Sequence, residues 1–203
     1  YGIALTNARA DAAILAEMRK KGYDENRLNE GMKLFDAANE LFAAQKKEYG
    51  EQLEASQILS KKRAEADALY MDTITFARTV FEDDAGAYSS LLLSGVRKRS
   101  LSGWFQQADT FYRNLTSNSD YLQKMAWYGY TKEKLEAEHK ALKEVVEADA
   151  NHKKEMGESQ ESTKLRDMKF DELSDWMSKF YVAAKIALKN KPQWLEKIGI
   201  VQQ

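Results

Sequence analysis

The sequence lacks cysteine altogether, and its 203 residues include a single proline. Without cysteine the chain can form no disulfide, iron–sulfur cluster or Cys-ligated zinc site, and it has no thiol nucleophile. Proline interrupts helices and is common in loops, so its scarcity beside abundant Ala, Leu, Glu and Lys predicts long helices. No stretch shows the period-2 alternation of a strand. We therefore expect an all-α fold.

An excess of charge of either sign is also missing. Lys plus Arg total 31 and Asp plus Glu total 32, which gives a net charge of -1, and residues 1–100 and 101–203 are each close to balance. Neither half has the basic surplus that non-specific binding of nucleic acid requires. No apolar run reaches the roughly 18 residues of a membrane span, and no signal peptide is visible. We expect a cytoplasmic protein without a membrane span, although Tyr1 in place of Met leaves open a targeting segment removed before this sequence begins.

A six-residue motif occurs twice in the sequence, as KKEYGE at 46–51 and as KKEMGE at 153–158. The same offset of 107 residues relates a second pair of motifs, and an alignment at this offset needs no gap over 60 positions, of which 15 are identical. Such an internal match predicts two tandem helical repeats. We place them at 1–96 and 97–203, with the alternative that both are parts of one intertwined pseudo-two-fold unit.

The second pair of motifs predicts a tight corner in each repeat. Gly22 suits the position after a helix end, where φ is positive, and Asp24 can cap the next helix. Tyr23 before the cap and Leu28 after it form a hydrophobic staple. The residues 107 positions later take the same roles: Gly129, Thr131, Tyr130 and Leu135.

The segment after each corner, 24–81 or 131–188, carries a stripe at helical spacing over about 58 residues. In one interpretation each segment is a single long helix, and the two pack antiparallel and cross where Gly50 and Gly157 permit close backbone approach. In the other, each segment folds back, near 55–62 in the first repeat, to give two consecutive helical bundles. Average helix length favours the bundles. The ungapped repeat and the missing turn signals favour long helices, which we expect.

Shorter helices are expected around the two long segments. The apolar spacing predicts one helix near 4–20, a short one near 85–93, and another that begins near Trp104 after a serine cap. Asn118 predicts the start of a short helix that runs to about Trp127.

Two segments, KKEYGEQ at 46–52 and RKRSLSGW at 97–104, resemble those of an uncharacterised bacterial family of all-helical proteins. The resemblance covers most of the chain, from about residue 20 to the end. It implies a bacterial source and an all-helical fold. It brings with it no activity, substrate or site residue.

The two histidines of the chain, each with an acidic residue three positions before it, form the weak candidates for a metal site: Glu136, His139, Asp149 and His152. The spacing places each pair on one face of a helix. Because a helix rises 1.5 Å per residue, the two pairs lie about 20 Å apart and cannot share an ion. Di-iron bundles collect their ligands from four facing helices. Solvated helix faces are the simpler explanation, and we expect no bound metal or cofactor.

Aromatic residues are dense between 104 and 130. An aromatic-lined pocket between helices could hold an apolar ligand. The weak candidates to line it are these residues: Trp104, Tyr112, Trp127 and Tyr128. The core of one helical lobe explains the same residues more simply.

A compact basic tract, RKR at 97–99, is followed by Trp104 and Phe105. Cations beside aromatic rings could contact a phosphate backbone and stack a base. A linker between the repeats, with its cations near the end of the preceding helix, explains the tract equally well.

No pattern in the sequence is typical of catalysis, because neither a Gly-x-Ser-x-Gly elbow nor a glycine-rich phosphate loop is present. We expect a non-catalytic helical scaffold or protein-interaction module, with a protein partner or self-association. The alternatives are a bundle that binds a small ligand or a metal, and a nucleic-acid accessory protein that uses 97–104.

Overall fold

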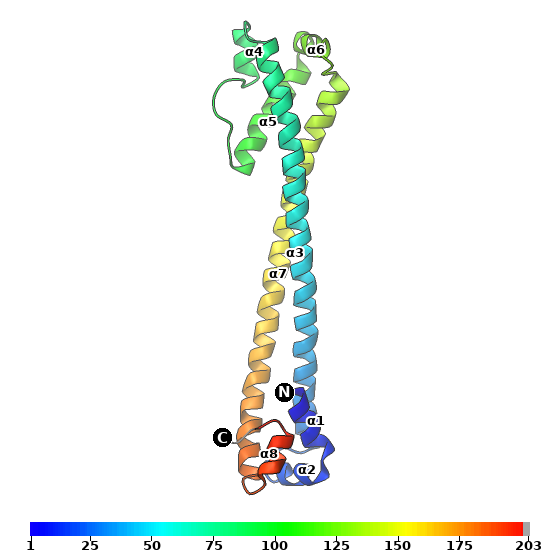
Figure 1. Cartoon of the computed structure of the whole chain (residues 1–203), viewed down its shortest axis with the longest axis vertical. Helices are drawn as coiled ribbons and strands as arrows, with labels where there is room; N and C mark the ends of the chain where they lie inside the picture. Colours follow the sequence, from blue (N-terminus) through cyan, green and yellow to red (C-terminus); the bar gives the residue numbers. More distant parts are fainter. Residues whose placement is uncertain (201–203) are drawn as a thin grey trace. The chain divides into compact units, whose positions relative to one another are not determined.

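The computed structural model describes residues 1–200, and every regular element in that range is a helix, which confirms the all-α prediction (Figure 1). Two helices are long, α3 at Glu25–Val80 and α7 at Lys132–Ala187, with 56 residues each. The other helices in the described range are short: α1 Gly2–Ala10, α2 Ala12–Arg19, α4 Ala85–Ser90, α5 Leu101–Ser117, α6 Ser119–Ala126 and α8 Pro192–Lys197. None of the helices described is long and apolar enough to cross a membrane.

The chain forms two compact units, and each long helix contributes to both. Within the described residues, unit 1 consists of Tyr1–Glu51 and 156–200, and unit 2 consists of Gln52–Glu155. Each unit therefore takes the short helices that precede one long helix and the short helix that follows the other. The units do not coincide with the segments 1–96 and 97–203, because the first half of each long helix lies in one unit and its second half lies in the other.

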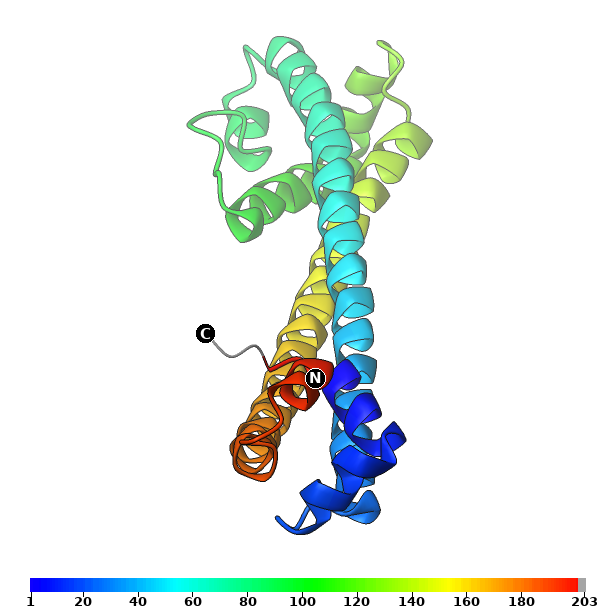
Figure 2. The same ribbon diagram turned by 60° about the horizontal axis from the view of Figure 1, so that its bottom comes forward.

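Both long helices continue without interruption through the segments where a turn was considered, near 55–62 and 162–169. The prediction of long helices is confirmed, and the folded-back alternative is wrong. Neither helix contains a proline to end it. Within unit 1, and separately within unit 2, the segments of α3 and α7 lie side by side and run antiparallel (Figures 1 and 2).

The close backbone approach expected at the mid-helix glycines is absent. A Cβ atom built on Gly50 or on Gly157 would meet no heavy atom within 4 Å. The predicted close approach of another helix at these glycines is therefore wrong, because both positions face open space. Space is restricted instead at Gly31 of α3, where a Cβ atom would lie 2.5 Å from the indole ring of Trp176 and the ring would have to move.

Both predicted corners form with the capping contacts that the sequence indicates. Gly22 and Gly129 have φ angles of +82° and +85°. After the first corner, Asp24 Oδ1 accepts a hydrogen bond from the N–H three residues later at 2.9 Å. After the second, Thr131 Oγ1 accepts the corresponding bond at 3.3 Å. These side chains satisfy N–H groups that the first turn of a helix leaves without a partner.

The helix boundaries recur at the offset found in the sequence. Helix α7 begins and ends 107 residues after α3, as α8 does after α4 and α6 after α2. Helices α1 and α5 also end 107 residues apart, although α5 is longer at its beginning. Two residues separated by this offset are called counterparts below.

The prediction of a single helix near 4–20 is wrong, because Asp11 divides this stretch into α1 and α2. The backbone of Asp11 is extended, with ψ of 106°, and the Asp11 side chain accepts hydrogen bonds from the N–H groups of Ala13 and Ile14. Asn118, the counterpart of Asp11, caps α6 in the same manner. A capping side chain thus begins α2 and α6 at positions 107 residues apart.

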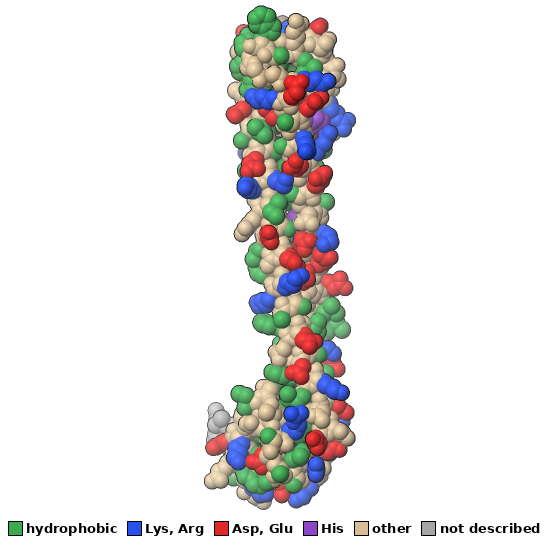
Figure 3. Space-filling view, turned by 90° about the vertical axis from the view of Figure 1, so that its right-hand side faces the viewer, with side chains coloured by type: hydrophobic (Ala, Val, Ile, Leu, Met, Phe, Trp, Pro, Cys, Tyr) green, Lys and Arg blue, Asp and Glu red, His purple; other side chains and the backbone are tan. Residues whose placement is uncertain are grey.

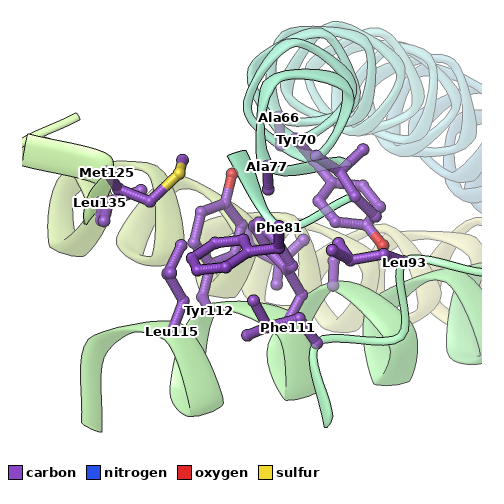
Figure 4. Packing of buried hydrophobic residues seen from close by; sticks show 14 of the residues in the cluster. Ala66, Tyr70, Ala77, Phe81, Leu93, Phe111, Tyr112, Leu115, Met125 and Leu135 are labelled. Atoms are coloured by element: carbon purple, nitrogen blue, oxygen red, sulfur yellow. The ribbon is translucent and has the colours of Figure 1, made fainter. Parts of the chain in front are cut away.

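Each unit has a hydrophobic core of its own. In unit 2 the core is built around buried rings, among them Tyr70, Phe81, Phe111 and Tyr112 (Figure 4). The ring centroids of Tyr70 and Phe111 lie 5.6 Å apart in an edge-on arrangement. The core of unit 1 uses more aliphatic residues together with Phe180. Burial of each large apolar side chain contributes roughly 1.5–3 kcal/mol, so these clusters hold the long helices together within each unit.

Candidate functional site

The aromatic residues between 104 and 130 separate into a buried and an exposed set. Trp104 and Tyr112 lie in the core of unit 2 and are 2% and 1% exposed. Trp127 and Tyr128 are 84% and 62% exposed. The four residues considered as the lining of a ligand pocket are therefore in two different environments, and only the second pair is available to a molecule in solution.

Trp104 is bound on two sides by residues of α3. Its indole Nε1–H donates to Asp67 Oδ1 at 2.6 Å, and the guanidinium carbon of Arg63 lies 4.0 Å from the centre of its ring. A cation over the ring face and a carboxylate on the N–H satisfy both the apolar and the polar part of an indole. The ring is thus committed to the fold of unit 2 and is not free to stack on a base.

The first cation of the basic tract is also committed to the fold. The guanidinium of Arg97 donates to the hydroxyl of Tyr70 at 2.6 Å and to the carbonyl of Leu92 at 2.8 Å, which fastens the segment between α4 and α5 to the core. Lys98 and Arg99 are exposed. A contact of 97–104 with a phosphate backbone is therefore left with two cations.

The four candidate metal ligands lie in separate surroundings. His139 Nε2 is 2.7 Å from Asp109 Oδ1. Glu136 and Asp149 each pair with a lysine one helical turn away, at 3.8 and 2.6 Å, and His152 is half-buried. Within residues 1–200, none of the four belongs to a group of three acidic or histidine side chains whose ligand atoms converge. The structure thus does not bring these residues together around one ion.

A buried carboxylate that our sequence analysis missed lies beside His139. Glu138 is 5% exposed, and its Oε2 accepts hydrogen bonds from Thr73 Oγ1 at 2.7 Å and from the Tyr112 hydroxyl at 3.0 Å. One oxygen of α7 thereby connects to α3 and to α5. Burial raises the pKa of Tyr112, and the negative charge of Glu138 raises it further, because both oppose the phenolate. The available signal was an acidic residue inside the apolar stripe between Leu135 and Leu142.

The counterparts of this polar cluster in unit 1 cannot form the same hydrogen bonds. Phe180, Gly31 and Leu5 stand where unit 2 has Thr73, Glu138 and Tyr112, and all three are buried. In unit 1 these three positions are therefore packed without a hydrogen bond between their side chains. The hydrogen bonds of Glu138 are made to Thr73 and Tyr112, within the cluster itself. The cluster therefore connects α7 to α3 and α5.

The exposed aromatic pair lies at the corner between α6 and α7. The ring of Tyr128 packs edge-on against Phe76 of α3, with 5.0 Å between centroids, and the ring of Phe76 stacks on Tyr130 at 5.2 Å. Trp127, the residue after the end of α6, projects into solvent. We call these four residues, Phe76, Trp127, Tyr128 and Tyr130, the aromatic corner.

The counterparts of Trp127 and Tyr128 are Lys20 and Lys21, and both lysines are exposed. The two turns have the same backbone geometry. In each, a glycine with positive φ follows, and the next residue is a tyrosine whose N–H donates to the carbonyl five residues earlier, at 3.1 Å in unit 1 and 3.2 Å in unit 2. A turn that forms with two lysines does not need two aromatic rings. The backbone of the turn thus does not account for the two exposed rings.

Charge around the aromatic corner is mixed. The Nζ of Lys134 lies 3.9 Å from the centre of the Tyr130 ring, and Lys124 pairs with Asp84 at 3.4 Å. Acidic and basic side chains are interspersed on the visible face of each unit (Figure 3). A surface without a field of one sign favours contact with a protein over contact with a polyanion.

No protein family matches the chain, and no curated protein or solved structure shows significant similarity to it. The internal comparison between counterpart residues therefore separates what the fold requires from what is additional to it. By that criterion the aromatic corner is the candidate functional site.

Proposed function

We propose that the chain is a non-catalytic helical protein-interaction module and that the aromatic corner binds a protein partner. The observation that carries this proposal is the exposure of Trp127 and Tyr128 at a turn that Lys20 and Lys21 build equally well. Trp and Tyr are enriched among the residues that dominate binding energy at protein interfaces. Single exposed apolar residues are common on protein surfaces, but two adjacent aromatic rings form a patch.

The geometry of the corner favours binding because its rings are partly ordered in advance. Tyr128 rests against Phe76, and Phe76 is in turn stacked on Tyr130. Rigid aromatic side chains lose little conformational entropy when a partner covers them. At about 25 cal/mol per Å², a partner that covers about 150 Å² of these rings gains roughly 4 kcal/mol before the entropic cost of association.

The test is a double variant, Trp127→Lys with Tyr128→Lys, which gives the second turn the residues of the first. Tagged parent and variant are expressed in bacterial cells, because the resemblance described above implies a bacterial source. Proteins that co-purify with the parent alone are then purified, and their binding is measured by calorimetry. We expect the dissociation constant to rise at least tenfold in the variant, a change of about 1.4 kcal/mol.

A matched control is Lys20→Ala with Lys21→Ala, which alters the corresponding turn of unit 1 and should leave binding unchanged. Circular dichroism melts of all three proteins establish that the fold is retained. A purified partner that binds the parent and the Trp127→Lys/Tyr128→Lys variant with one dissociation constant would refute the assignment to the aromatic corner.

A further inference from the structure

Two turns of each unit carry charge of opposite sign in the two units. In unit 1 the turns are 19–21, at the end of α2, and 189–191, between α7 and α8. Their counterparts in unit 2 are 126–128, at the end of α6, and 82–84, between α3 and α4. We call the first two the basic turns and the other two the acidic–aromatic turns.

The residues of these turns separate by charge without exception. The basic turns contain five cations and no acidic residue: Arg19, Lys20, Lys21, Lys189 and Lys191. The acidic–aromatic turns contain three acidic residues, no cation, and two rings of the aromatic corner: Glu82, Asp83, Asp84, Trp127 and Tyr128. Two surfaces of one chain are therefore complementary in charge.

One ion pair in each unit joins its two turns into a single surface. In unit 1, Lys191 Nζ lies 3.3 Å from Glu17 Oε1 on α2, and in unit 2, Asp84 Oδ2 lies 3.4 Å from Lys124 Nζ on α6. Lys191 is the counterpart of Asp84, and Glu17 is the counterpart of Lys124. The same contact is thus made in both units with the signs of the two charges exchanged.

Other charges of both surfaces remain available to a partner. Among residues 1–200, Glu82 and Asp83 of unit 2 take part in no ion pair, and neither do Lys21 and Lys189 of unit 1. All four side chains are exposed, as is Trp127 beside them. Each surface therefore offers charges that only a second molecule can pair.

We propose that the basic turns of one copy of this chain bind the acidic–aromatic turns of a second copy. The inference rests on the proposed function, because Trp127 and Tyr128 belong to the contact, and it names the partner. A lysine ammonium is attracted both to a carboxylate and to the face of an aromatic ring. Each cation of the basic turns therefore meets a favourable group whichever of the two acidic–aromatic turns it faces.

The complementary contact is also selected against its alternatives. Two basic surfaces repel each other, as do two surfaces that carry Glu82 and Asp83, so contact between identical surfaces is disfavoured. A contact between unequal surfaces leaves each bound copy with one further surface free, and copies add in an open series unless the series closes into a ring. The average mass should therefore rise with protein concentration and fall with added salt, which screens exposed charges.

The experiment uses two full-length variants that each retain one intact surface. Trp127→Lys with Tyr128→Lys alters the acidic–aromatic turns, and Lys21→Ser with Lys189→Ser alters the basic turns. Sedimentation velocity at about 50 mM salt is measured for the parent, for each variant and for their mixture. We expect the parent to associate, and each variant alone to associate at least tenfold more weakly. The mixture should form a 1:1 complex, because it holds one intact surface of each kind.

The matched control is Lys98→Ser with Arg99→Ser, which removes two exposed cations outside both surfaces and should associate as the parent does. Circular dichroism melts of all variants should stay close to that of the parent. The Lys20→Ala/Lys21→Ala variant keeps its aromatic corner and should still bind a parent copy through it.

Three results would overturn the proposal. They are a parent that stays monomeric at about 0.5 mM, a mixture of the two variants that forms no complex, and a control that loses association as Lys21→Ser/Lys189→Ser does. A monomeric chain to which another protein binds through Trp127 and Tyr128 would overturn this inference and leave the proposed function standing. Association that persists in Trp127→Lys/Tyr128→Lys would contradict the role of the two rings in the contact between copies.

Discussion

Tyr112 donates a hydrogen bond to Glu138 across the core of unit 2, with 3.0 Å between the phenol oxygen and Oε2. The counterpart pair in unit 1, Leu5 and Gly31, has no side-chain polar group. Because both units are built from similar segments, each short helix has two similar places in which it could pack. If α1 packed in the place of α5, Leu5 would replace Tyr112 and the buried carboxylate of Glu138 would lose one hydrogen-bond donor. The contact between Tyr112 and Glu138 therefore disfavours an arrangement in which α1 and α5 exchange places.

The first prediction concerns the strength of that contact. Tyr112→Phe leaves Glu138 with Thr73 as its remaining hydrogen-bond donor, and we expect the free energy of unfolding to fall by about 1–3 kcal/mol. Urea denaturation measures the change. Tyr121→Phe is the control, since its hydroxyl is in an exposed contact at 3.5 Å, and it should change stability by less than about 0.5 kcal/mol. Equal effects of the two variants would contradict the role assigned to Tyr112.

A second prediction follows from the raised pKa of Tyr112. In the folded chain, burial raises the pKa of the Tyr112 phenol, so the hydroxyl stays protonated at high pH. In the unfolded chain the phenol ionises near its ordinary pKa of about 10. Above this pH the unfolded state binds fewer protons than the folded state, so stability declines as pH rises. Urea titrations on both sides of this pH should show a smaller loss in Tyr112→Phe than in the parent. Part of the loss should remain, because burial also raises the pKa of Tyr70.

The mid-helix glycines supply a third prediction. Gly50→Ala and Gly157→Ala each place a methyl group in open space and remove the backbone entropy of glycine, so each should stabilise the protein by about 0.5–1 kcal/mol. Gly31→Ala should destabilise it, because the new Cβ meets Trp176. Thermal melts of the three variants decide the matter. A loss of stability in Gly50→Ala would restore the idea of a close crossing at that residue.

A fourth prediction separates the three cations of the basic tract. Arg97→Ala removes hydrogen bonds to Tyr70 and to the carbonyl of Leu92, and we expect a loss of about 1–3 kcal/mol. Amide hydrogen exchange in the segment between α4 and α5 should become faster. Lys98→Ala and Arg99→Ala should leave both measurements near the parent values. Three indistinguishable variants would show that Arg97 does not fasten this segment.

The fifth prediction uses tryptophan fluorescence. Of the four tryptophans, Trp127 is 84% exposed, Trp104 is buried, and Trp176 and Trp194 are half-buried. Trp127→Lys should therefore shift the emission maximum to shorter wavelength and remove most of the fluorescence that iodide quenches. An unchanged quenching curve would place Trp127 in a covered position, which would exclude it as a free contact surface.

Local signals predicted the two long helices and both corners, because the capping and the interruption of a helix are decided by a few neighbouring atoms. Gly22 and Gly129 predicted both corners, and the absence of proline predicted α3 and α7. The break at Asp11 was missed although Asn118 carries the same signal. The role of Gly50 could not be predicted, since a glycine in open space and a glycine at a crossing look alike in a sequence.

The candidate site depended on burial, which a sequence does not state. Trp104 and Trp127 are the same residue type near the two ends of one aromatic segment, and only packing separates the buried ring from the exposed one. The alignment does set Lys20 and Lys21 opposite Trp127 and Tyr128. The difference between two lysines and two aromatic residues points to a candidate site only when the structure shows that both turns have the same backbone geometry.

The division of each long helix between two units has a consequence for a chain that contained only one repeat. Such a chain would hold the first half of one core and the second half of the other, and it could close neither by itself. The missing halves would be found on a second identical copy, so its smallest complete assembly would be a homodimer with exchanged helices. In this chain a single polypeptide supplies both halves of each core. Lys20 can therefore differ from Trp127, and Gly31 from Glu138, where a symmetric homodimer would carry the same residue twice.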